Sequence, residues 1–228
     1  MIADTIGIAL AAVTIDYYYK KYYRDKEYKT IDQSEYELLI GYNINGPIKV
    51  NMQSNPHLLV TGLSGQGKSR CIRAMLSNLQ ATKKADIILM NVFNEDYKGI
   101  QARVINNEES ILKTIINILT RREVHSKPLY LVIEELGTLK SKELNESIKE
   151  LLRVGRHYNI FLVGVIQIAT KEDCKFKSYF NARLTFRQLD DASYRVVLGT
   201  GIGEKILNKR EFALVSDDLY FGKTYIIN

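Results

Sequence analysis

The residues from 62 to 69 place glycines, a lysine and a hydroxyl group in an arrangement that can hold a polyphosphate. They read Gly62-Leu63-Ser64-Gly65-Gln66-Gly67-Lys68-Ser69 and fit the phosphate-loop pattern G-x-x-x-x-G-K-[ST]. The glycines let successive backbone N–H groups point at an anion, and a helix that starts near Gly67 adds the positive end of its dipole. The competing interpretation is a glycine-rich turn without a ligand. It is weakened by the apolar segment before the pattern and the helical segment after it.

The same pattern gives individual side chains their roles. We expect Lys68 to reach the β- and γ-phosphates of ATP and Ser69 to bind Mg²⁺. Arg70 follows directly, and we expect it to be one of the nucleotide-binding residues. The loop therefore predicts ATP and Mg²⁺ as cofactors.

Two carboxylates follow an apolar segment farther along the chain. The segment is Leu129–Ile133, and the acids are Glu134 and Glu135. Ligands of α/β sheets bind at the carboxyl ends of strands. We expect Glu134 to hold Mg²⁺ through water and Glu135 to orient or deprotonate the attacking water. A strand that runs into a solvated acidic helix cap is the alternative, and the nearby phosphate loop makes it less favoured.

A third apolar segment, Ile160–Ile166, ends in the polar residue Gln167. Its side chain could contact the γ-phosphate and report hydrolysis. The alternative is a neutral polar residue that merely caps the strand.

The elements that must position these residues alternate between strands and helices. The expected strands are residues 37–42, 48–52, 57–61, 85–92, 129–133, 160–166, 182–186, 212–215 and 223–227, and the expected helices are 67–80, 108–125, 142–154 and 192–198. Such alternation predicts an α/β fold with a mainly parallel sheet and helices on both faces. Asn45-Gly46 predicts a hairpin turn between the first two strands. Residues 37–228 are numerous enough to bury such a sheet as one domain.

Composition excludes several other classes of protein. The chain has 228 residues, of which 46% are hydrophobic and 25% charged, which argues against disorder and collagen-like structure. Neither the two cysteines, Cys71 and Cys174, nor the three histidines have the spacing of a zinc site. We interpret the cysteines as free thiols in a reducing compartment. The net charge of +6 permits a polyanionic partner without requiring one.

The N-terminal residues leave two interpretations open. Ile6–Ile15 is the most apolar stretch, and tyrosines and basic residues follow it up to Arg24. Positive charge after an apolar segment is typical of an uncleaved anchor whose C-terminal side is cytoplasmic. Ten helical residues, however, span only about 15 Å of a ~30 Å hydrocarbon core. Residues 1–23 are therefore either a membrane anchor or a helix that packs on the protein itself or on a neighbouring subunit. Residues 24–36 are expected to be a linker, and 1–30 to be dispensable for ATP chemistry.

Several segments together resemble the FtsK/SpoIIIE family of DNA-pumping motors, within the FtsK–HerA class. The likeness covers residues 38–228, and its strength lies in the order and spacing of the pieces. Ile40–Pro47 and Asn55–Gly62 are similar to the family's G-x-D-I-x-G and x-P-H-L-L-I-A-G, and Gln167 falls on the glutamine of A-T-Q-R-P. Three further segments resemble x-A-R-A-A-G-I-H-L, N-I-P-T-R-I-A-F and G-A-E-K-L-L-G-K: Val154–Leu162, Asn181–Phe186 and Gly203–Lys209.

The resemblance implies a RecA-like P-loop NTPase that couples ATP hydrolysis to DNA movement. It also implies a homo-oligomer, a hexameric ring with nucleotide between subunits, and a partner that is double-stranded DNA bound without sequence preference. An arginine from the neighbouring subunit would then stabilise the transferred phosphate, and Arg156 and Arg183 are the candidates by position. Each could instead simply pair with a surface carboxylate.

The sequence also departs from the family pattern. Glu134-Glu135 stands where the family usually has Asp-Glu, and Ile168-Ala169 replaces Arg-Pro after the glutamine. The family's four-span membrane region and winged-helix DNA reader have no counterpart here. We therefore expect the motor of a plasmid, an integrative element or a virus, located in the cytoplasm or at the inner face of the cell membrane. Conjugation or plasmid maintenance is the first hypothesis, and viral genome packaging is the second. A non-hydrolysing nucleotide-binding membrane scaffold is the third.

Overall fold

The structure is a computed structural model that describes residues 24–121, 123–170, 172–203 and 205–227. The apolar segment Ile6–Ile15, and with it the anchor hypothesis, lies outside the described residues. None of the helices in the described part is long and apolar enough to cross a membrane.

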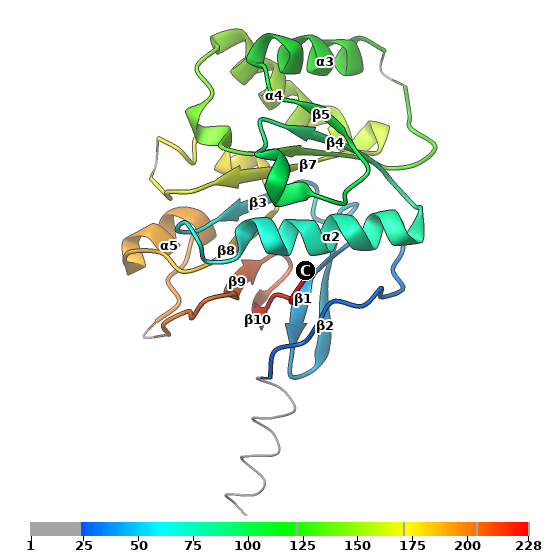
Figure 1. The fold of residues 1–228 in the computed structure, drawn as a ribbon. Coiled ribbons are helices and arrows are strands. Elements are labelled where there is room, and N and C mark those ends of the chain that lie inside the picture. Colours follow the sequence, from blue (N-terminus) through cyan, green and yellow to red (C-terminus); the bar gives the residue numbers. More distant parts are fainter. Residues whose placement is uncertain (1–23, 122, 171, 204, 228) are drawn as a thin grey trace, which may run out of the picture.

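A ten-stranded sheet forms the centre of the described residues, in the order β2-β1-β10-β9-β8-β3-β7-β6-β4-β5 (Figure 1). The six strands from β8 to β5 are parallel to one another, whereas β9, β10, β1 and β2 pair in antiparallel fashion. The strands are β1 (Glu37–Asn43), β2 (Gly46–Asn51), β3 (Leu58–Thr61), β4 (Asp86–Met90), β5 (Arg103–Ile105), β6 (Leu129–Ile133), β7 (Ile160–Ile166), β8 (Ala182–Thr185), β9 (Glu211–Val215) and β10 (Leu219–Lys223). The predicted α/β fold with a mainly parallel sheet is confirmed.

Helices cover both faces of this sheet. They are α2 (Lys68–Thr82), α3 (Glu108–Arg121), α4 (Lys142–Val154) and α5 (Asp191–Leu198). The apolar side chains of α3, α4 and α5 belong to one buried cluster and those of α2 to another, on the opposite face of the sheet. Alternate residues of β6 belong to different clusters, as expected for a strand covered on both sides. Leu131 lies in the first cluster and Val132 in the second.

The predicted hairpin is present, and its turn explains why the sequence signal was strong. Asn43 pairs with Gly46, and Gly46 has a φ of 119°, which favours glycine. The resulting hairpin of β1 and β2 lies at the edge of the antiparallel half of the sheet.

Three elements differ from expectation. The strand expected at 223–227 is instead β10 at Leu219–Lys223, because a tight turn in which the Ser216 N–H donates to the Asp218 carbonyl closes a hairpin with β9. The helix expected to reach residue 125 ends at Arg121, and Val124 beyond it is exposed. The short edge strand β5 was not foreseen, because three residues carry too little periodicity to be recognised.

Candidate functional site

The glycine-rich loop joins the end of β3 to the start of α2. Gly62, Gly65 and Gly67 all have positive φ values, of 141°, 72° and 115°. A Cβ atom on Gly62 would also lie only 2.6 Å from the Cβ atom of Phe186. Gly67 caps α2 without any side-chain hydrogen bond, so the first N–H groups of the helix remain available to an anion. This backbone favours glycine and forms a cradle that could hold a phosphate group.

The side chain of Lys68 turns back onto the phosphate loop. Its Nζ donates hydrogen bonds to the carbonyl oxygens of Gly62 (2.5 Å) and Leu63 (3.0 Å). Burial lowers the pKa of Lys68, although the nearby Glu134 acts in the opposite direction. An ammonium group has three protons to donate, so the two carbonyls fix its position while one N–H remains for a phosphate oxygen.

The two acids after β6 have different surroundings. Glu134 is half-buried, and its Oε1 accepts a hydrogen bond of 2.6 Å from the hydroxyl of Tyr97. Burial raises the pKa of Glu134, while the Tyr97 hydroxyl and the charge of Lys68 oppose the rise. Glu135 is exposed and has a left-handed φ of 53°. The site thus offers one sheltered carboxylate and one accessible carboxylate.

Gln167 lies at the end of β7, the strand next to β6 in the sheet. Its Nε2 donates to Oε1 of Glu135 over 3.1 Å. The structure therefore brings these two predicted residues together, because neighbouring parallel strands end at the same edge. An amide that holds one carboxylate oxygen of Glu135 orients the other.

Two site residues that sequence reasoning missed come from the short helix η1 (Asn94–Tyr97) after β4. Oδ2 of Asp96 accepts a hydrogen bond of 3.2 Å from Oγ of Ser69. Tyr97, the next residue, is buried and donates to Glu134. Consecutive residues thus contact the two predicted Mg²⁺ ligands. Their position in the sequence could have indicated this role. Both residues follow the apolar segment 85–92, and the strand in that segment ends at the same edge of the sheet as the strand before Glu134 and Glu135.

A cavity of about 390 Å³ opens over these groups. The predicted residues that line it are Ser64, Gly65, Gly67, Lys68, Ser69, Arg70, Glu134, Glu135 and Gln167. Asp96, Val165, Lys209 and Arg210 also line it and were not predicted. Gly62, Leu63 and Gln66 are not among the lining residues, but their carbonyl oxygens accept hydrogen bonds from Lys68 and Arg210, which are. The volume and the cations suit a nucleotide polyphosphate.

The residues present also fit a magnesium ion. Within the described ranges, no cluster of three or more histidine, cysteine or acidic side chains could hold a metal by itself. Mg²⁺ in nucleotide sites is usually bound by one or two carboxylates together with waters and substrate phosphates. Ser69, Asp96 and Glu134 all line the cavity, Ser69 donates to Asp96, and the three could supply such a partial set.

The two arginines proposed to act between subunits lie away from this cavity. Arg156 is exposed in η3 (Gly155–Tyr158) before β7, so the length of that strand, about 20 Å, separates it from Gln167 at the other end. Arg183 is half-buried in β8, where its Nη1 donates to the carbonyl oxygen of Val197 over 3.2 Å. Burial lowers the pKa of Arg183. Neither arginine is among the residues that line the cavity.

Comparison with known proteins agrees with this geometry. The profile of the FtsK/SpoIIIE family matches residues 20–179, more than half of the chain. DNA translocase FtsK of Staphylococcus aureus (strain Mu50) is 23% identical over 233 residues, and the match covers 82% of this chain and 29% of that protein. The chain thus spans less than a third of the length of this relative.

Solved structures that share the fold at low sequence identity include the following two. The pCW3 conjugation coupling protein TcpA, solved with ATPγS, has a TM-score of 0.76 and 18% identity; the match covers 87% of this chain and 68% of that one. The genome packaging NTPase B204 of Sulfolobus turreted icosahedral virus 2, also solved with ATPγS, has a TM-score of 0.55 and 14% identity. That match covers 78% of this chain and all of B204.

Proposed function

We propose that this chain, which belongs to the FtsK/SpoIIIE family, is a Mg²⁺-dependent ATPase motor that moves double-stranded DNA. The observation that carries the proposal is the single cavity in which the phosphate loop, two acids and a glutamine meet. The FtsK relatives are DNA translocases by name, and two structural neighbours were solved with an ATP analogue.

The chemistry follows from the position of each group. The loop N–H groups and Lys68 bind the phosphates of ATP, and a Mg²⁺ ion held by Ser69 and Glu134 would neutralise charge on them. Glu135 accepts a proton from the attacking water, since it is accessible and acts as the carboxylate that Gln167 orients. Gln167 is also well placed to sense whether a γ-phosphate is present, because it lines the cavity.

The oligomer is part of the proposal. An arginine that reaches a nucleotide from a neighbouring subunit must point out of its own subunit, and Arg156 is exposed as this requires. Arg183 is the second candidate, although its guanidinium already donates to the end of α5. A hexameric ring would place one of these arginines at each nucleotide and would line a central pore with basic residues.

We propose two alternative biological settings for this motor. Conjugative transfer or plasmid maintenance is supported by the neighbour named as a conjugation coupling protein. Genome packaging is supported by a viral NTPase that the chain covers over its full length. A relaxase gene or a capsid gene beside this gene would decide between them.

We also propose that residues 1–23 contact the cytoplasmic face of the membrane. A deletion designed to test it should end at residue 23, because the residues that follow are hydrogen-bonded to the body of the protein. Tyr28, for example, donates its N–H to the carbonyl oxygen of Ile226 over 2.7 Å.

The test of the proposed function is ATP turnover measured while double- or single-stranded DNA is titrated. We expect double-stranded DNA of any sequence to stimulate turnover. We also expect its affinity to fall with salt, with a log–log slope of about −0.9 for each phosphate neutralised. Lys68→Ala, which should bind DNA without turnover, is the control. A preference for one short sequence would overturn the translocase assignment, and absent turnover with bound ATP would favour the nucleotide-binding scaffold.

Replacing Tyr97 with phenylalanine should lower Mg²⁺-dependent turnover by about tenfold. The change removes only the hydroxyl that holds Glu134, and a hydrogen bond to a charged group is worth about 1.5–3 kcal/mol. The measurement is turnover as a function of Mg²⁺ concentration. Tyr220→Phe is the matched control, because its hydroxyl bonds only to the surface residue Asp217. Equal Mg²⁺ dependence in both variants and the parent would show that Glu134 needs no such support.

A further inference from the structure

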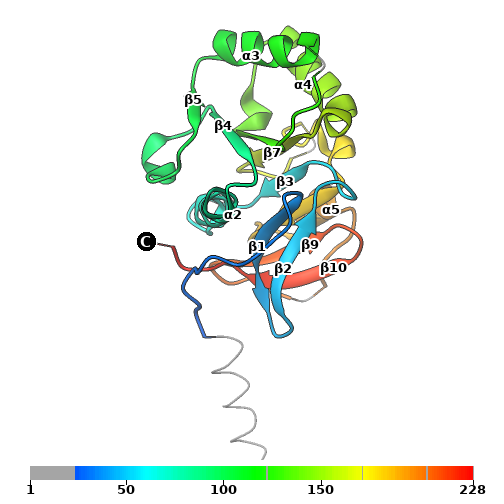
Figure 2. The same ribbon diagram turned by 90° about the vertical axis from the view of Figure 1, so that its right-hand side faces the viewer.

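The residues expected to form a linker are bound to the body of the protein as a strap, which we define as residues 24–33. The Tyr28 N–H donates to the carbonyl oxygen of Ile226, and the Ile226 N–H donates to that of Lys26 (2.7 and 2.9 Å). In Figure 2, where α2 is seen nearly end on, this dark blue segment and the red C-terminal residues run side by side below the helix.

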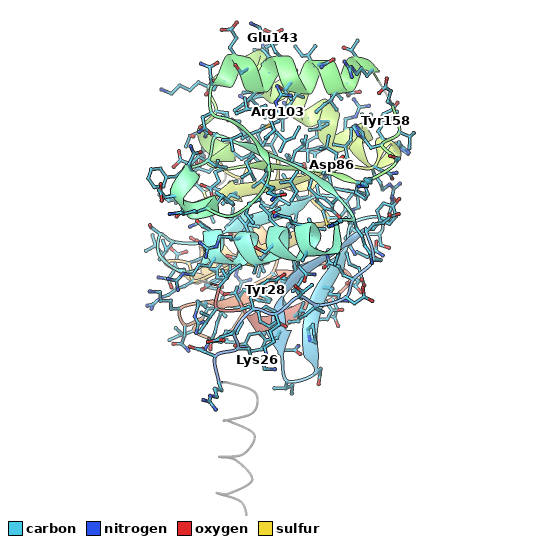
Figure 3. All side chains as sticks on the ribbon, turned by 45° about the vertical axis from the view of Figure 1, so that its right-hand side comes forward. Lys26, Tyr28, Asp86, Arg103, Glu143 and Tyr158 are labelled. Carbon is cyan, nitrogen blue, oxygen red and sulfur yellow. The ribbon has the colours of Figure 1, made fainter. Side chains whose placement is uncertain are left out.

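The strap is also fixed to α2, the helix that Lys68 begins. Asn78 of α2 is fully buried, and its side-chain amide accepts from the N–H of Ile31 (2.8 Å) and donates to the carbonyl of Ile31 (2.9 Å). The hydroxyl of Tyr28 donates to the same amide oxygen over 3.2 Å. Figure 3 shows Tyr28 just below this helix and Lys26 farther down. A buried amide used in this way holds one backbone residue in a defined position.

A second connection leads from the strap to the phosphate loop itself. The N–H of Arg210 donates to the carbonyl oxygen of Gln66 over 2.9 Å. The stem of Arg210 packs beside Gly67, where a Cβ atom would lie 3.3 Å from Cγ of the arginine. The guanidinium group of Arg210 forms an ion pair with Asp25 of the strap. Arg210 therefore contacts the loop with its backbone and stem and the strap with its charge.

This ion pair matters because the arginine is buried. Arg210 is only 8% exposed, and its Nη1 has no hydrogen-bond partner among the residues that the structure describes. Lys223 adds a second cation, whose Nζ lies 2.6 Å from Oδ1 of Asp25. The hydrogen bond from Lys223, followed by that from Arg210, lowers the pKa of Asp25 against the effect of burial. Without Asp25, a buried guanidinium would lose the acid that balances it.

We propose that Asp25 and Arg210 are positioning residues for the nucleotide cavity, through which the strap holds the phosphate loop in its binding shape. The inference rests on the proposed function, because it concerns regulation of the same cavity. Coupling between two sites is reciprocal, so a bound nucleotide must in turn tighten the strap. Any force on the residues before the strap would then alter nucleotide affinity.

The contacts of the strap also change which N-terminal residues can be deleted without affecting nucleotide binding. The sequence predicts that residues 1–30 contribute nothing to ATP chemistry. A deletion to residue 30 would remove both Asp25 and Tyr28, and with them the contacts to Arg210 and Asn78. We expect such a deletion to weaken nucleotide binding, whereas one that ends at residue 23 leaves these contacts in place.

The first test measures the dissociation constant of a fluorescent ATP analogue with Mg²⁺. We expect Asp25→Asn to weaken binding by about tenfold, within the usual range of coupling between sites, and Asp25→Glu to restore most of it. Asp32→Asn is the matched control: Asp32 belongs to the same strap, but its carboxylate pairs with Lys84, which follows α2 at the end of the helix opposite the phosphate loop. Parent-like affinity in Asp25→Asn would overturn the inference.

Lys68→Ala separates this outcome from failure of the proposed function. If the parent binds the analogue and Lys68→Ala does not, the cavity is a nucleotide site whatever Asp25 does. If the parent does not bind, the proposed function itself fails.

The second test needs no variant and therefore does not depend on how well a variant folds. Amide hydrogen exchange of the parent is followed with and without the ATP analogue. We expect the nucleotide to slow exchange in peptides that contain Tyr28, Ile31 and Ile226, whose N–H groups make the strap contacts. Unchanged exchange in these peptides, alongside protection of the phosphate loop, would show that the strap does not respond to the cavity.

Discussion

Replacing Lys68 with alanine should abolish ATP turnover while leaving the fold intact. The ammonium group bonds only to two carbonyl oxygens of its own loop, so no other element depends on it for position. Burial lowers the pKa of Lys68, which means that burial of its charge costs free energy; alanine avoids this cost, which opposes the loss of the two hydrogen bonds. Loss of one preorganised donor at a transferring phosphate typically lowers turnover by a factor of about 10²–10³.

The measurement is phosphate release under saturating Mg²⁺ and ATP, with thermal unfolding to verify the fold. Lys113→Ala is the matched control, since this lysine is exposed on α3 and pairs with Glu109 on the same helix. Turnover of Lys68→Ala within a few-fold of the parent would mean that the cavity is not where hydrolysis occurs.

The parallel half of the fold could be predicted from sequence because its signals are local. Strands such as β6 and β7 are continuous apolar runs bounded by polar residues, and such runs are typical of strands covered on both faces. The phosphate loop is equally local, since its glycines and Lys68 lie within eight consecutive positions. In the antiparallel half, the hairpin of β1 and β2 was also predicted from a local turn signal, whereas β10 was misplaced, because its position is set by a hairpin with β9 and not by the apolar pattern of 223–227.

The parts of the site that sequence reasoning missed depend on distant pairs of residues. Asp96 and Ser69 belong to different elements, and no sequence motif indicates that η1 lies beside the phosphate loop. Arg210 meets Gln66 and Asp25 only because β9 and β10 bring the C-terminal residues beside β1 and the strap. Neither contact has a characteristic spacing in sequence, so only the folded chain reveals it.

The same reasoning explains why residues 24–36 were expected to be a linker. Their composition is polar and charged, which is typical of exposed connections. They are held by backbone groups, as at Ile31, by the ion pair of Asp25, and by the side chains of Tyr28 and Ile31, which pack against a small cluster of Leu39, Tyr42 and Tyr225. Two separated apolar side chains are too few to form a periodic pattern, so the sequence does not indicate that the segment is docked.

Glu135→Gln should bind ATP normally and hydrolyse it at least about a hundredfold more slowly, as expected when a general base is removed. The amide keeps the size of the side chain and its contact with Gln167 but cannot accept the proton of the attacking water. Ground-state binding should survive, because the base acts only in the transition state. The variant should therefore hold the oligomer in its ATP-bound state.

Glu134→Gln should behave differently, because Glu134 is the sheltered acid beside Ser69 and Tyr97. We expect it to weaken Mg²⁺-dependent ATP binding as well as turnover. Glu143→Gln is the control for both variants, since this glutamate lies in the first turn of α4, near the top of Figure 3 and outside the cavity. The measurements are single-turnover hydrolysis and ATP affinity at several Mg²⁺ concentrations. If Glu134→Gln alone traps bound ATP while Glu135→Gln remains active, the two acids exchange roles: the sheltered carboxylate is the base, and the accessible one is the ligand of Mg²⁺.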